Sequence, residues 1–91
     1  SFGAARGINS RIAQLHNYEA LLLDISDVPR MGVTAALAVE RMIQEAESQG
    51  RIAVVAGANQ QLTQRLRRFG VDKVMPDRLK ALEHIQNVLK R

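Results

Sequence analysis

Two aspartates are the first side chains of this sequence whose types and spacing could do chemistry. Asp24 and Asp27 lie in the segment DISD, directly after an apolar stretch, and a pair of carboxylates could act as general acid and base. Residues in such a position more often hydrogen-bond loop amides and cap the following helix. We favour this second interpretation, so the sequence predicts a structural role for both aspartates.

The second candidate is a cluster of arginines at positions 65, 67 and 68. On a helix, Arg65 and Arg68 are neighbours at i and i+3, whereas Arg67 points elsewhere. Arg65 and Arg68 could contact an anion, with Lys73 and Arg78 nearby in the sequence. The alternative is that these residues keep an amphipathic helix soluble, and the sequence alone favours that alternative.

Other kinds of chemical site lack their residue patterns. The chain has no cysteine, which excludes disulfides and thiolate ligands, and His16 and His84 have no neighbouring metal ligands in the sequence. No glycine-rich loop for a dinucleotide or a phosphate follows an apolar stretch. Ser10, Ser26 and Ser48 have no context that marks an activated nucleophile. We therefore expect no cofactor, no metal site and no enzymatic activity.

Length and composition narrow the class of protein. The 91 residues suffice for a single domain, spanning 1–91, and 46% of them are hydrophobic. Aromatic residues make up only 3%, which argues against a base-stacking surface for nucleic acid. The aliphatic run Ala20–Leu23, like every other such run in the sequence, is far shorter than the ~20 residues of a membrane helix. Because the chain starts at Ser1 and not at Met, we expect a soluble piece of a longer protein.

The net charge of +4 is concentrated in the second half of the chain, where nine Lys and Arg residues face four acidic ones. A basic half-domain could meet an anionic partner such as lipid headgroups, nucleic acid or a nucleotide. The alternative is that the basic residues form a solvated exterior. Because the surplus of positive charge is small, the charge pattern alone favours this alternative.

The elements that must position these residues follow a strand–helix–strand pattern. Residues 18–26 and 51–57 are short apolar blocks typical of buried strands. Between them, apolar residues recur on one face of a helix that Gly50 ends. This face consists of Ala35, Val39, Met42, Ile43 and Ala46. We expect Leu22, Ile25, Val54 and Val55 to be almost fully buried, with Val39 and Ile43 packed over them.

The rest of the chain continues the alternation. Asn59 is expected to cap a helix with the apolar stripe Leu62, Leu66 and Phe69, followed by a short edge strand within Val71–Met75. Asp77 should cap a last helix. Its predicted stripe is Leu79, Leu82, Ile85 and Leu89. An additional helix is expected around Ile8, Ile12 and Leu15. The pattern predicts an α/β domain with a mostly parallel sheet.

Three segments of this chain resemble the STAS domain, the fold of the anti-sigma-factor antagonists. The stretch ALLLDISDVPRMGVTAALA resembles the STAS strand, loop and helix, and GRIAVVAGANQQLTQRLRRFGVDKV resembles the next strand, loop and helix. The opening SFGAARGI is similar to a segment of STAS domains at the C-terminus of SulP, or sulfate-permease-type, anion transporters. The resemblance is to the sodium-dependent bicarbonate transporters of cyanobacteria within that family, and it places the family's first strand before Ser1.

One departure from the family pattern concerns the loop before the helix. In regulatory members a kinase phosphorylates an Asp–Ser/Thr–Ser/Thr–Gly motif, which adds a charge of roughly −1.5 to −2. The corresponding positions here are Gly32, Val33, Thr34 and Ala35. Because Val33 cannot accept a phosphate and Thr34 has no adjoining aspartate, the resemblance does not extend to a phosphorylation switch.

The resemblance implies a non-catalytic cytoplasmic domain of a SulP-type transporter for bicarbonate or sulfate, located on the inner side of the cell membrane. Its implied partners are the transmembrane part of the same protein and a second copy in a homodimer. The implied interface is the loop formed by Pro29, Arg30, Met31, Gly32 and Val33, where Met31 and Val33 would gain from leaving water. For the dimer, the alternative contact is the strand edge that the missing first strand would expose. The alternative is a soluble STAS regulator of the anti-sigma-factor-antagonist type, and nucleotide binding stays open.

Overall fold

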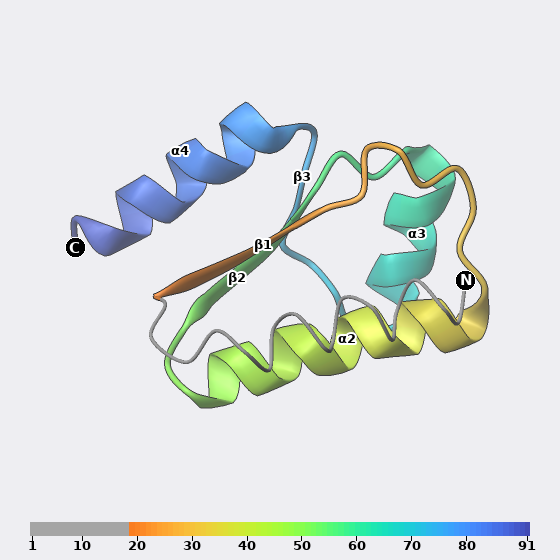
Figure 1. Ribbon diagram of the computed structural model, residues 1–91, viewed down its shortest axis with the longest axis horizontal. Coiled ribbons are helices and arrows are strands. Elements are labelled where there is room, and N and C mark those ends of the chain that lie inside the picture. The colour runs from red at the N-terminus through yellow and green to blue at the C-terminus, as the bar shows by residue number, and fades with distance from the viewer. Residues whose placement is uncertain (1–18) are drawn as a thin grey trace.

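The computed structural model describes residues 19–91, so the helix expected around Ile8, Ile12 and Leu15 lies outside the described residues. Strands and helices alternate along the chain, as the sequence predicted (Figure 1). The elements are β1 (Ala20–Asp24), α2 (Val33–Ser48), β2 (Ile52–Ala56), α3 (Gln60–Arg68), β3 (Val74–Met75) and α4 (Arg78–Leu89).

The sheet of the described residues has three parallel strands in the order β1-β2-β3. The register places Leu22 opposite Val54 and Leu23 opposite Val55. Pairing continues one residue past β1, where the Ile25 N–H donates to the carbonyl of Ala56 over 2.9 Å. The carboxyl ends of β1 and β2 therefore lie side by side, and the two loops that follow them leave the same edge of the sheet.

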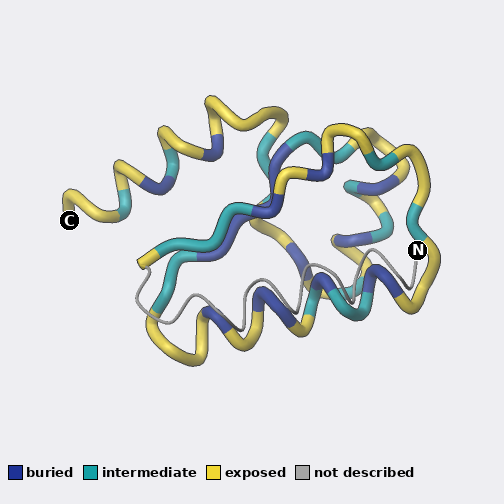
Figure 2. The backbone as a smooth tube through the Cα atoms, in the orientation of Figure 1, coloured by how far each residue is buried: buried dark blue, intermediate teal, exposed yellow. Residues whose placement is uncertain are grey.

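Helices cover both faces of this sheet, with α2 and α3 on one side and α4 on the other (Figure 1). The larger core lies between the sheet and the first two helices, and the smaller one lies under α4, as the dark blue segments of Figure 2 show. The larger core includes Leu23, Ile25, Val39, Ile43, Val55 and Leu66. The smaller core consists of Val54, Ala56, Ala81 and Ile85.

The predicted core is confirmed for Ile25, Val54 and Val55, but the prediction for Leu22 is wrong. Leu22 is only half-buried, and it faces α4 together with Val54. Successive side chains of a strand point to opposite faces, so a helix that covers Val55 does not cover Leu22 or Val54. Val39 and Ile43 therefore pack against Leu23, Ile25 and Val55 instead.

Capping residues set the starts of two helices, as predicted. The side chain of Asn59 accepts a hydrogen bond from the Leu62 N–H over 2.8 Å at the start of α3. Asp77 accepts one from the Lys80 N–H over 2.8 Å at the start of α4. These bonds satisfy backbone donors that have no partner within the helix itself.

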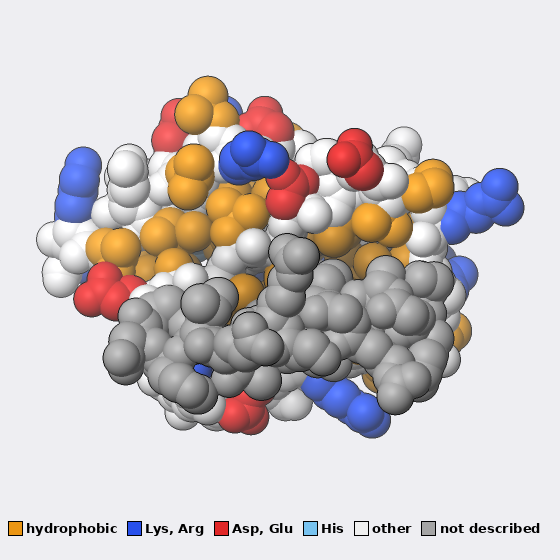
Figure 3. Space-filling view, viewed as in Figure 1, with side chains coloured by type: hydrophobic (Ala, Val, Ile, Leu, Met, Phe, Trp, Pro, Cys, Tyr) orange, Lys and Arg blue, Asp and Glu red, His pale blue; other side chains and the backbone are white. Residues whose placement is uncertain are grey.

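The predicted apolar stripe of α4 is wrong for three of its four residues. Ala81 and Ile85 face the sheet, whereas the leucines at positions 79, 82 and 89 are exposed. Because the side chain of Ala81 is small, α4 can approach the strands closely with Ala81 and Ile85 facing the sheet. Figure 3 shows apolar side chains gathered along α4 and over the adjoining sheet. Within residues 19–91, none of the helices has the length and apolar character needed to cross a membrane.

Candidate functional site

The loops that follow β1 and β2 touch each other closely. Gly57, directly after β2, has φ +81°, and a Cβ built there would lie 2.3 Å from Ser26 Oγ. Its N–H donates to the carbonyl of Met75 over 3.0 Å, so the same residue also joins β3. A side chain at position 57 would push the two loops apart, and glycine is therefore required here.

Asn59 fastens the loop after β1 to the start of α3. Its Nδ2 donates to the carbonyl of Pro29 over 3.1 Å, while its Oδ1 accepts from the Leu62 N–H. The sequence predicts the cap but not the bond to Pro29. An asparagine at the N-cap, unlike an aspartate, has amide protons left to donate, and that difference was the available signal.

A groove of about 550 Å³ lies between this loop and α3. Its lining includes Arg30, Met31, Gly32, Leu62, Arg65 and Arg68. Residues from two separate predictions therefore line one groove. They come from the predicted interface loop at residues 29–33 and from the predicted anion contact, Arg65 and Arg68. Nothing in the sequence spacing placed them side by side, because more than thirty residues separate Arg30 from Arg65.

The groove carries an uncompensated positive charge. The ion pairs of the described residues join Lys73 to Glu47, Arg78 to Asp24 and Lys80 to Glu83, and none of them involves an arginine of the groove. One groove is thus lined by three arginines that have no acidic partner among the described residues, with Arg30 at its rim and Arg65 and Arg68 on α3. Such an arrangement favours an anionic ligand, since clustered like charges repel one another until a counter-charge binds.

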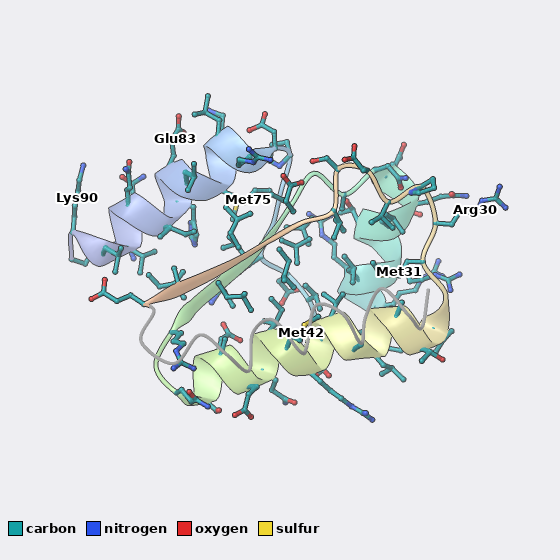
Figure 4. The ribbon with its side chains drawn as sticks, viewed as in Figure 1. Arg30, Met31, Met42, Met75, Glu83 and Lys90 are labelled. Carbon is teal, nitrogen blue, oxygen red and sulfur yellow. The ribbon has the colours of Figure 1, made fainter. Side chains whose placement is uncertain are left out.

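The arginines and the methionine of this region point in different directions. Arg30 extends outward from the rim of the groove, whereas Met31 points toward α3 (Figure 4). Met31 is half-buried against the larger core. Arg67 lines a separate hollow of about 370 Å³ beside β3, which agrees with the prediction that it points elsewhere.

The positions of the degenerate phosphorylation motif form the start of α2. Gly32 is the N-cap and provides no side-chain cap, and Val33 follows with 53% of its surface exposed. Thr34 is exposed, whereas Ala35 is buried in the core. The loop thus presents a single hydroxyl group to solvent, on Thr34.

Asp24 is held in a structural arrangement. One carboxylate oxygen, Oδ1, accepts hydrogen bonds from the backbone N–H and the hydroxyl of Ser26. The other, Oδ2, accepts from Nε and Nη2 of Arg78 over 3.1 and 2.8 Å. The bonds from Ser26, together with Arg78, lower the pKa of Asp24 from 3.8 to about 2. A carboxylate that shares a proton with a second one has a raised pKa, so this geometry supports the loop-capping interpretation of Asp24.

Asp24 predicts a defined pH dependence of stability. Its pKa is lower in the folded chain than in the unfolded chain, so the unfolded state binds more protons between these two values. Its contribution is therefore present above about pH 4 and is lost as the pH falls toward 2. In urea unfolding, the stability difference between wild type and Asp24→Asn should shrink across this range. A difference that stays constant would contradict the assigned hydrogen bonds.

The remaining candidate side chains form no site within the described residues. His84 is half-buried on α4, and no group of His, Asp and Glu residues in the range 19–91 could hold a metal ion. His16 and Ser10 lie outside the described residues. The hydroxyl of Ser48 donates to the carbonyl of Glu45 over 2.7 Å, as expected near the end of a helix.

With the geometry established, comparison with known proteins assigns the family. The sequence profile of the STAS domain matches residues 1–89. The chain belongs to the STAS domain family. The fold agrees, since this STAS domain superposes on a sulfate transporter family protein from Wolinella succinogenes with a TM-score of 0.85 at 22% identity. The superposition covers 99% of this chain and 80% of the Wolinella protein.

Two further kinds of relative connect the domain to transporters. The STAS domain of a SulP transporter from Vibrio cholerae is 26% identical, with a TM-score of 0.78 over 98% of this chain and 75% of that one. The bicarbonate transporter BicA of Synechocystis is 38% identical over 76 residues, and that of Picosynechococcus is 39% identical over 75. These alignments cover 84% and 82% of this chain but only 14% and 13% of the transporters. The chain thus corresponds to a small part of those relatives.

Proposed function

We propose that this STAS domain is the non-catalytic cytoplasmic domain of a SulP-type secondary anion transporter that takes up bicarbonate or sulfate. The observation that carries this proposal is the 38% identity to BicA over most of the chain. In this proposal residues 1–91 form the C-terminal domain of a longer protein. The partner of this domain is the transmembrane part of the same protein. The domain itself lies on the inner side of the cell membrane.

The proposal is tested on the full-length gene product. We expect the remainder of the gene to encode repeated apolar segments of about 20 residues, each long enough to span a bilayer. Expressed in cells that lack their own bicarbonate and sulfate uptake, the protein should import one of these labelled anions. Absence of the apolar segments, or of uptake of both anions by a correctly inserted protein, would contradict the transporter assignment.

A soluble regulator of the anti-sigma-factor-antagonist type is the second candidate, and the exposed hydroxyl of Thr34 is the observation that favours it. Val33 and Ala35 on either side of it cannot accept a phosphate. Incubation with cell extract and ATP should leave Thr34 unmodified if the transporter proposal is correct. Stoichiometric phosphate on Thr34, detected by mass spectrometry, would favour the regulator instead.

Within the transporter proposal, two surfaces are suited to protein contacts. The loop at residues 29–33, with the exposed Val33, is the proposed contact with the transmembrane part. The exposed leucines of α4 are the proposed contact with a second copy. Leu79, Leu82, Gln86 and Leu89 are spaced by three, four and three residues, the spacing of the a and d positions in paired helices. This ridge presents a larger apolar surface than Val33 does.

The homodimer leads to a direct measurement. In sedimentation experiments over a hundredfold concentration range, the mass of the chain should rise from monomer toward dimer. Leu79, 67% exposed, contributes little to the core, so Leu79→Glu should weaken association roughly tenfold without unfolding the domain. Asn87→Glu adds the same charge at an exposed position of α4 outside the ridge and serves as the matched control. A monomer at every concentration, or equal weakening by both variants, would contradict this interface.

A further inference from the structure

The arginine groove combines features that suit a particular kind of partner. Arg30 stands at its rim on the loop after β1, while Arg65 and Arg68 line it from α3. Guanidinium groups bind carboxylates through paired hydrogen bonds, which makes arginine the preferred residue for acidic groups at protein surfaces. Because the three groups come from two elements, an anionic ligand that reaches all of them must span the width of the groove.

The floor of the groove adds an apolar contact between these charges. Met31 points toward α3, and it lines the groove together with Leu62, which is almost fully buried. A methionine side chain is flexible and adapts its shape to an apolar partner. The ligand should therefore carry an apolar group as well as negative charges, a requirement that a bare inorganic anion does not meet.

The walls indicate a polypeptide rather than an enclosed small molecule. Small-molecule sites bury some 70–90% of their ligand, whereas Gly32, Arg68 and the glutamines at positions 61 and 64 are exposed along this groove. Glutamine side chains both donate and accept hydrogen bonds, as a peptide backbone requires. Among residues 19–91, the lining of the groove has no aromatic side chain on which a nucleic acid base could stack.

We propose that this groove binds an acidic segment of a partner polypeptide, with an apolar side chain over Met31 and Leu62 and carboxylates on Arg30, Arg65 and Arg68. The inference goes beyond the transporter assignment, because it concerns a partner that the 91-residue chain recognises by itself. The hydrogen bond from Asn59 to Pro29 holds the two walls of the groove together, so the site exists before the peptide binds.

The experiment uses a short fluorescein-labelled peptide that is rich in glutamate and contains two leucines, with fluorescence anisotropy as the readout. The double variant Arg65→Gln and Arg68→Gln should raise the dissociation constant roughly tenfold or more, because charge-assisted hydrogen bonds are lost. Arg67→Gln is the control, since it removes one positive charge from the same helix outside the groove, half of what the double variant removes. It should change the dissociation constant by less than about twofold.

Further arms of the experiment identify what the groove recognises. Replacing the leucines of the peptide with serine should weaken binding, and replacing its glutamates with glutamine should abolish it. Circular dichroism establishes that each variant is folded. The proposal is overturned if no binding occurs at millimolar concentration, or if Arg67→Gln is as damaging as the double variant. It is also overturned if tripolyphosphate or ATP binds more tightly than the peptide, because the groove would then be a phosphate site. None of these outcomes depends on anion uptake by the full-length protein.

Discussion

Replacing Leu66 with alanine should lower the free energy of unfolding by about 2–5 kcal/mol. Leu66 lies on α3 with none of its surface exposed, in the larger core that also contains Val39 and Val55. The substitution removes buried methyl groups and leaves a cavity that the surrounding side chains fill only in part. Urea denaturation followed by circular dichroism measures the change directly.

Two other leucines provide the comparison for this prediction. Leu79→Ala, at a site that is 67% exposed, should change the free energy of unfolding by less than about 0.5 kcal/mol. Leu22→Ala should fall between the two, because Leu22 is half-buried under α4. If Leu66→Ala left the denaturation midpoint unchanged, or if all three variants behaved alike, the assignment of the core would be wrong.

The order of the elements could be predicted from the sequence because each carries a strong local signal. The apolar blocks around Leu22 and Val54 are too short for helices, and the spacing from Ala35 to Ala46 fits one helical face. The failure on α4 has a physical reason. That helix carries two neighbouring apolar lines, one of leucines and one through Ala81 and Ile85. Packing against the sheet selects the second line, and periodicity alone cannot decide between them.

The candidate site was harder to predict, because it depends on contacts between segments distant in sequence. Arg65 and Arg68 were identified as a pair on one helix, and the loop at residues 29–33 was identified through the family resemblance. That both line one groove follows from the sheet order and the bond between Asn59 and Pro29. Asp24 is a further example, since its partner Arg78 lies 54 residues away and no local pattern marks the pair.

Substituting alanine for Gly57 should lower the free energy of unfolding by about 2–5 kcal/mol, because two separate costs combine. The first is the backbone conformation, since φ +81° is unfavourable for any residue with a Cβ. The second is the collision of that Cβ with Ser26, whose Oγ lies 2.3 Å away and whose Cα lies 3.0 Å away. The Ser26 hydroxyl can rotate, whereas the backbone of the loop must shift.

Gly50→Ala separates these two costs. Gly50 has φ +76°, close to that of Gly57, but a Cβ there would meet nothing within 4 Å. It should therefore show only the conformational cost of about 1–2 kcal/mol, and the remainder at Gly57 measures the contact between the loops after β1 and β2. Because that contact positions the chain leading to Pro29 and Arg30, Gly57→Ala should also weaken binding of the acidic peptide, while Gly50→Ala should not. Equal destabilisation by the two substitutions would show that the loops do not touch as the structure places them.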